Sequence, residues 1–81
     1  MNDRVTVRFD LPCRADGYTR SELTAMQDAL IARSGVQMRI IWRFFNGMNG
    51  VSAYINRADL QKLRSSAGVI SVYNEVQNET Q

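Results

Sequence analysis

Residues 36–55, VQMRIIWRFFNGMNGVSAYI, hold two runs of alternating apolar and polar side chains on either side of a turn-rich link. An alternation with a period of two places one apolar face on a half-buried β-strand. The asparagines and glycines of residues 46–50 are typical of a tight turn between antiparallel strands. The stretch therefore predicts a β-hairpin. Its first strand is expected to direct toward the core Val36, Met38, Ile40, Trp42 and Phe44.

The segments around this hairpin complete a regular order of strands and helices. Residues 4–10 and 69–76 are two further apolar-rich stretches, and each predicts a strand. Thr19 and Glu22 have the spacing of a capping box, which starts a helix of about 15 residues that ends at Gly35. A second helix of about 11 residues is expected to end at Gly68. The order βαββαβ predicts an α+β ferredoxin-like sandwich, a four-stranded antiparallel sheet with both helices on one face.

The composition excludes most kinds of enzyme and metal site. The chain has 81 residues, 44% of them hydrophobic, which is enough for one small core and too short for most self-contained enzymes. It contains no histidine and one cysteine, so it lacks the commonest general base and metal ligand and cannot form an internal disulfide. We therefore expect a binding protein that is not an enzyme and needs no cofactor or metal. The net charge of +2 does not demand a nucleic-acid partner.

The sheet face that the helices leave uncovered, called the open face below, is either solvated or a docking surface. Its expected side chains form a mixture too apolar for solvation alone. Single exposed hydrophobic residues need no explanation, so scattered exposure is the alternative. Trp42, Met26 and Met38 are expected to pack in the core. The residues expected on the open face are Arg39, Ile41, Arg43, Phe45, Ser52, Tyr54 and Tyr73.

Three stretches of the sequence resemble one known family. They are residues 44–55, FFNGMNGVSAYI, residues 59–64, DLQKLR, and residues 68–75, GVISVYNE. In order and spacing they resemble the propeptides of subtilisin-like serine proteases and the free-standing fungal proteinase inhibitors built on that propeptide. The motifs cover residues 42–76, and the order of elements is similar along the whole chain. The resemblance implies a protein inhibitor of a subtilisin-like serine protease that can also act as its folding chaperone.

The resemblance also implies how such an inhibitor meets its protease. Family members lay the open face across two protease helices, and an acidic residue near the end of the last strand meets the N-terminal ends of those helices. Glu75 matches that residue, whereas a second acidic position of the family falls on Tyr73. The following residues enter the active-site cleft as a product-like strand, whose last residue occupies the primary specificity pocket. In this chain the implied cleft-binding residues are Gln77, Asn78, Glu79, Thr80 and Gln81.

Other interpretations of these features stay open. Glu75 can be a solvated charge at a strand end, and residues 77–81, which contain no apolar side chain, can be a frayed terminus. A ferredoxin-like sheet with aromatic residues is also the scaffold of RNA-recognition motifs, so an RNA-binding domain is the alternative function. RNA binding is disfavoured because the first strand is expected to direct Thr6 and Arg8 to the open face, and no aromatic ring on which a base could stack.

The expected organisation is a propeptide-like domain over residues 1–76 with an extended tail over residues 77–81. We expect it to be a monomer when free and to have no nucleic-acid partner. We expect no membrane partner either, because no apolar run suits a signal peptide or a membrane anchor. The methionine at its start favours a separately made product, which would be cytoplasmic. If the chain is instead excised from a protease precursor, its location is not predicted.

Overall fold

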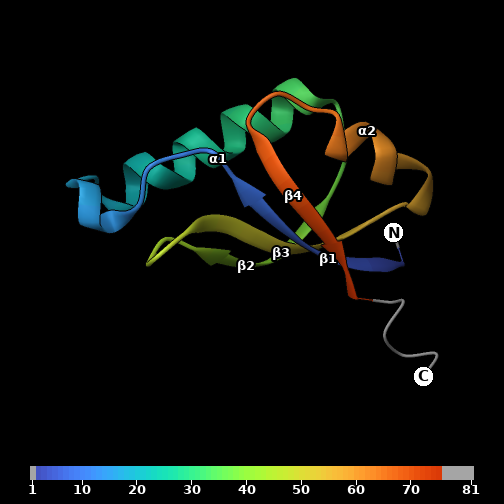
Figure 1. The fold of residues 1–81 in the computed structure, drawn as a ribbon, viewed down its shortest axis with the longest axis horizontal. Coiled ribbons are helices and arrows are strands. Elements are labelled where there is room, and N and C mark those ends of the chain that lie inside the picture. The colour runs from blue at the N-terminus through green and yellow to red at the C-terminus, as the bar shows by residue number, and fades with distance from the viewer. Residues whose placement is uncertain (1, 76–81) are drawn as a thin grey trace.

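The computed structural model describes residues 2–75 as a four-stranded sheet with two α-helices (Figure 1). Short 3-10 turns, η1 (Arg14–Asp16) and η2 (Arg57–Asp59), precede the two helices. The predicted cleft-binding residues 77–81 lie outside the described residues. The elements in chain order are β1 (Asp3–Phe9), α1 (Arg20–Ser34), β2 (Arg39–Phe44), β3 (Asn49–Ile55), α2 (Leu60–Arg64) and β4 (Val69–Asn74).

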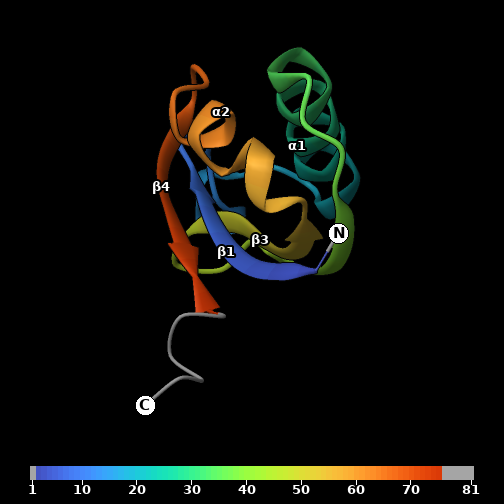
Figure 2. The same cartoon turned by 90° about the vertical axis from the view of Figure 1, so that its right-hand side faces the viewer.

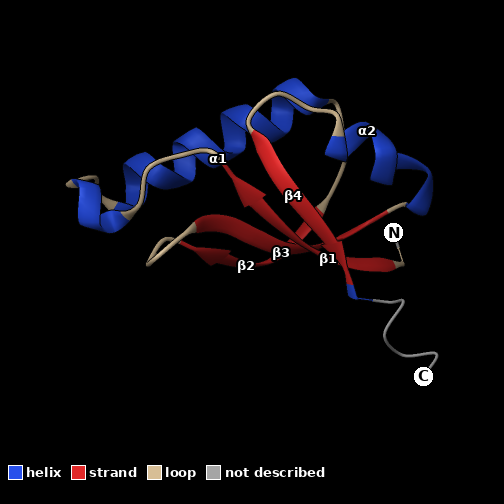
Figure 3. Cartoon of the chain, in the orientation of Figure 1, coloured by secondary structure: helices blue, strands red, loops and turns tan. Residues whose placement is uncertain are grey.

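The four strands form one antiparallel sheet in the order β2-β3-β1-β4. Figures 1 and 2 show α1 and α2 on the same side of this sheet, and Figure 3 shows the strands as a layer beneath the helices. The predicted α+β ferredoxin-like fold is therefore confirmed. Because β2 and β4 are the two edge strands, the described chain ends, at Glu75, on the edge opposite β2.

The core lies between the sheet and the helices. Every second residue of the central strands β1 and β3 points into it, as an alternating sequence predicts. Each Val, Leu, Ile or Phe side chain that is fully buried there stabilises the fold by roughly 1.5–3 kcal/mol. The most deeply buried apolar side chains are Val5, Val7, Phe9, Leu23, Leu30, Val51, Ala53, Ile55 and Leu63.

The helix α1 begins at the predicted capping box. The Glu22 backbone N–H donates to the Thr19 hydroxyl at 3.1 Å, and the Thr19 backbone N–H donates to the Glu22 carboxylate at 2.8 Å. This backbone hydrogen bond, together with one to the Thr19 side chain, lowers the pKa of Glu22. At the other end, Gly35 has the left-handed φ of 71° that a helix stop requires. Both ends of α1 and its 15 residues agree with the sequence prediction.

The helix α2 is shorter than the predicted 11 residues, because it spans only Leu60–Arg64 after the 3-10 turn η2. Two serines explain its early end. The Ser65 hydroxyl donates to the Gln61 carbonyl and the Ser66 hydroxyl to the Lys62 carbonyl, both at 2.9 Å. Side-chain hydroxyls therefore supply hydrogen bonds to backbone carbonyls at the helix end. No helix within residues 2–75 is both long and apolar enough to cross a membrane.

A bulge in β2 reverses the expected positions of the side chains that follow it, Phe44 included. Ile40 pairs with Ala53 and Trp42 with Ser52, so Ile41 is an extra residue between two paired ones. One extra residue shifts the alternation, and every later side chain then faces the opposite side of the sheet.

The predictions for Trp42, Arg43 and Phe45 are therefore wrong. Trp42 was expected in the core but is 61% exposed, whereas Phe45 was expected on the open face but is only 4% exposed. Arg43 is directed to α1, where its guanidinium forms an ion pair with Asp28. The physical cause is the same for all three, because all follow the bulge at Ile41.

Candidate functional site

The register of the four strands orders the open face into rows that cross the sheet. The middle row consists of Trp42, Ser52, Thr6 and Tyr73, one residue from each strand. Trp42 and Tyr73, on the two edge strands, are 61% and 55% exposed. Between them, Ser52 and Thr6 are short hydroxyl side chains on the central strands. Large exposed rings therefore flank small side chains across the centre of the open face.

Ser52 is the buried polar group of this row. It is 4% exposed, and its Oγ makes no hydrogen bond to any atom of residues 2–75. A buried hydroxyl without a partner destabilises a fold by roughly 1–3 kcal/mol, so such groups commonly mark a place where another molecule supplies the bond. No helix of the described chain covers this face (Figure 2).

Glu75 lies at the end of β4, where β1 holds its carboxylate. The Thr6 hydroxyl donates to Glu75 Oε2 at 2.7 Å, and Arg4 Nε lies 3.4 Å from Oε1. The Glu75 side chain is 30% exposed, so part of the carboxylate faces solvent. Its geometry leaves an anionic group fixed beside the middle row and still accessible to hydrogen-bond donors from outside.

Arg39 and Tyr54 are paired across β2 and β3 in the row next to Trp42 and Ser52. The Arg39 guanidinium carbon lies 5.9 Å from the centre of the Tyr54 ring, a cation–π distance. Arg4 pairs with Tyr54 from the other side. This row therefore presents an aromatic ring between two cationic side chains, next to the Glu75 carboxylate.

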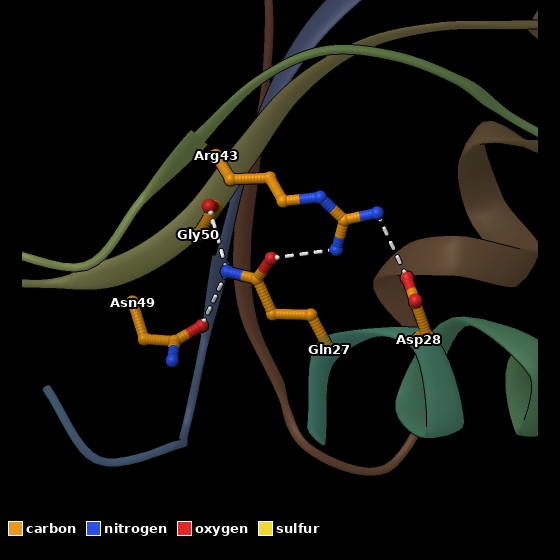
Figure 4. Close-up of polar contacts among 5 residues, drawn as sticks. All are labelled: Gln27, Asp28, Arg43, Asn49 and Gly50. Carbon is orange, nitrogen blue, oxygen red and sulfur yellow. Dashed lines mark hydrogen bonds and ion pairs between the residues drawn. The ribbon is translucent and has the colours of Figure 1, made fainter. Parts of the chain in front are cut away.

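Behind the sheet, a buried polar network ties α1 to the β2–β3 hairpin (Figure 4). Gln27 is fully buried, and its Nε2 donates to Asn49 Oδ1 at 2.8 Å and to the Gly50 carbonyl at 3.0 Å. Arg43 donates to Gln27 Oε1 at 3.2 Å and pairs with Asp28 at 2.9 Å. Every polar atom of the Gln27 side chain has a partner, so this network fixes the hairpin against the helix.

Sequence reasoning missed Gln27 and Asn49. A signal for Gln27 was present, because position 27 lies on the same helix face as Leu23 and Leu30, at spacings of four and three residues. Asn49 had none, since its partners, Gln27 and the Pro12 carbonyl, are distant in sequence.

The described residues hold no cluster of side chains suited to a metal ion. No group of three or more His, Cys, Asp or Glu residues within residues 2–75 is placed to hold a metal ion. The exposed rings of Trp42 and Tyr73 and the accessible carboxylate of Glu75 make the open face the candidate functional site.

The model of the family described as peptidase inhibitor I9 matches residues 15–81. The chain belongs to the peptidase inhibitor I9 family. This family comprises inhibitory propeptide-like domains of subtilisin-like proteases, so the resemblance seen in the sequence is confirmed. Searches of curated proteins and of solved structures found no significant match. The match to the I9 model includes residues 77–81, which follow the described residues.

The structure places the predicted interface residues in three different kinds of position. Ser52, Tyr54 and Tyr73 lie on the open face, and Ile41 is 41% exposed at the bulge. Arg43 and Phe45 are directed to the helix side and do not belong to the open face, whereas Trp42 does. Glu75 lies beside the open face. The binding roles of these residues stay predictions.

Proposed function

We propose that this I9 domain inhibits a subtilisin-like serine protease by docking its open face on the protease and placing residues 77–81 in the active-site cleft. The observation that carries the proposal is the middle row of the open face. Exposed Trp42 and Tyr73 flank the buried Ser52 hydroxyl, which lacks a partner within residues 2–75. Aromatic residues dominate the energy of many protein interfaces, so a partner that covers both rings gains most of its affinity from them.

Glu75 is proposed to contact the N-terminal ends of protease helices. Its carboxylate accepts one hydrogen bond from Thr6 and lies near Arg4, so β1 orients it before any partner arrives. A carboxylate has about four lone-pair positions, and the Thr6 bond occupies only one. Backbone N–H groups at a helix N-terminus can therefore bind the remaining positions without displacing Thr6.

The same docking would support a chaperone role. A surface that binds the folded protease and not its unfolded chain stabilises the folded state by mass action. We expect the domain to raise the refolding yield of the protease that it inhibits. A refolding assay with and without the domain measures this effect, which the tail-deleted chain described next should retain in part.

The experiment that tests the proposal is deletion of residues 78–81. Because none of these residues is apolar, the deletion should leave the circular dichroism spectrum and the urea midpoint of the domain unchanged. Inhibition of a subtilisin-like protease should weaken by about 100-fold or more, or about 2.7 kcal/mol. Equal inhibition by the deleted and full chains would refute a product-like tail.

The RNA-binding alternative is tested by its dependence on salt. Binding to single-stranded RNA falls steeply with salt, since cations are released from the phosphates, whereas docking on a protein face is mildly affected. We expect no measurable binding of single-stranded RNA at physiological salt. Micromolar binding that is lost on replacing Tyr54 would favour the RNA-binding function instead.

A further inference from the structure

A small pocket lies at the outer edge of the sheet, along β2, away from β4. Its volume is about 140 Å³, and three arginines and three aromatic residues line it. Figure 1 shows the start of α1 and the β2–β3 turn at the same end of the molecule, opposite α2. The arginines are Arg14, Arg20 and Arg43, and the aromatic residues are Trp42, Phe44 and Phe45.

Two of these arginines carry charges that nothing in the described chain neutralises. Arg43 is compensated by Asp28 at 2.9 Å. By contrast, Arg14 and Arg20 form no ion pair within residues 2–75, and no acidic side chain lines the pocket. The Arg20 guanidinium carbon lies 5.4 Å from the centre of the Phe45 ring, and the Arg14 backbone N–H donates to the Phe45 carbonyl at 2.9 Å.

The chemistry of the lining selects an anionic group of small size. A guanidinium presents parallel N–H donors that match the two oxygens of a carboxylate. The three rings exclude water from one side of the pocket, and a lower local dielectric strengthens the attraction between guanidinium and carboxylate. A volume of about 140 Å³ admits the end of one acidic side chain.

The distribution of charge favours a polypeptide over a nucleic acid. A nucleic acid is bound by a row of cationic side chains that follows successive phosphates. Here Arg4, Arg43 and Arg57 are all engaged by acidic side chains of the domain itself. Of the arginines that form no ion pair within residues 2–75, Arg14 and Arg20 are the two that line this pocket. In addition, β2 pairs only with β3, so its outer edge is open to an extended segment.

We propose that this pocket binds the carboxylate of an acidic side chain carried by an extended polypeptide segment. β2 and β4 form opposite edges of the sheet, so the pocket lies at the edge away from Glu75. The pocket would let the domain hold a second, acidic protein segment. It shares Trp42 with the middle row of the open face, so this segment and a docked protease would compete for that side chain. The proposal stands or falls without the proposed function.

The test titrates the free full-length chain with an acetylated, amidated tetraglutamate peptide and follows the fluorescence of Trp42, the single tryptophan. We expect a saturable change with a Kd on the order of 1 mM. Arg14→Gln and Arg20→Gln should each weaken binding by about 5- to 20-fold, the effect of losing a hydrogen bond to a charged group. The matched control is Arg33→Gln, in the last turn of α1, which should change binding less than about 2-fold.

Three outcomes would overturn the proposal. The first is equal binding of a tetraglutamine peptide, which lacks the carboxylates. The second is an Arg33→Gln chain that loses as much affinity as Arg20→Gln, because the attraction would then be to net charge alone. The third is tighter binding of an oligouridylate with the same dependence on Arg14 and Arg20. Circular dichroism of each variant confirms that it is folded. Arg20→Lys keeps the charge but lacks the planar guanidinium, so its affinity for tetraglutamate should lie between those of the parent and Arg20→Gln.

Discussion

Replacing Trp42 and Phe45 by alanine in separate chains tests both the bulge and the proposed interface. The two residues are three positions apart and therefore face opposite sides of the sheet, and the bulge decides which of them is buried: Trp42 is 61% exposed and Phe45 is 4% exposed. Phe45→Ala should therefore destabilise the domain by about 3–5 kcal/mol, the range for a buried phenylalanine. Trp42→Ala should cost at most about 2 kcal/mol, because roughly 80 Å² of a side chain of about 200 Å² is buried in the free domain.

Binding should show the reverse order. Docking can cover the remaining exposed surface of the Trp42 side chain, about 120 Å², which corresponds to about 3 kcal/mol or about 150-fold in affinity. Phe45→Ala should change the affinity of the folded domain by less than about 5-fold, since the ring faces the helix side. It should instead make the inhibitor a better substrate, because a domain that unfolds often is cleaved often.

The assay combines urea denaturation with inhibition of a subtilisin-like protease. Denaturation is followed by far-ultraviolet circular dichroism, because Trp42→Ala removes the single tryptophan. Inhibition is measured at a temperature where every variant is folded, and intact inhibitor is followed by mass spectrometry. If Trp42→Ala lost 3–5 kcal/mol of stability while Phe45→Ala lost little and bound weakly, β2 would have no bulge and the reasoning here would be refuted.

Three more substitutions test the close approach at Gly50, the role of Glu75 and the capping box of α1. Gly50→Ala should destabilise the fold by about 3 kcal/mol or more in thermal or urea unfolding, because its Cβ would overlap the Val7 carbonyl oxygen. Gly47→Ala, at a φ of 74° and with no neighbour within 4 Å, should cost only about 1–2 kcal/mol, and equal costs would contradict the close approach at Gly50. Glu75→Gln should weaken inhibition by about 2- to 30-fold with little change in stability, and Glu79→Gln should weaken it less; an equal loss for the two would argue against a specific role of Glu75. Because the pKa of Glu22 is lowered on folding, its contribution to stability is present above the unfolded pKa and is lost as the pH falls through the folded pKa; the difference in Tm between the parent and Glu22→Gln should therefore shrink on acidification, and a difference that grows would show the sign to be wrong.

Local signals in the sequence predicted the order of elements, the capping box of α1 and the hairpin, because each of these depends on residues close together in the chain. The bulge was not predictable in the same way. Ile40 and Ile41 are adjacent apolar residues, and either can face the core, so the choice depends on pairing with β3. Since one extra residue reverses the strand, this single ambiguity misplaced Trp42 and Phe45.

The hydrogen bonds of the buried Gln27 could not be predicted from the sequence either. Gln27 is stable in the core because Asn49, Gly50 and Arg43 each supply a hydrogen-bond partner for its amide. None of these partners is near Gln27 in sequence, and Arg43 reaches it only as a result of the bulge. A buried polar residue whose partners come from three-dimensional neighbours cannot be inferred from periodicity alone.

The contacts of Glu75 with Thr6 and Arg4 also set the length of a tether. They fix the chain to β1 at residue 75, and the proposed cleft-binding residues begin at Gln77. Once the open face is docked, the tail then has only a short reach from a fixed point, which raises its effective concentration at the cleft to the millimolar range typical of short linkers. Face and tail would thus act as the two halves of a bivalent ligand, and a tail that binds weakly as a free peptide would bind tightly here. A protease that cuts between them would lose this gain at once and release both halves.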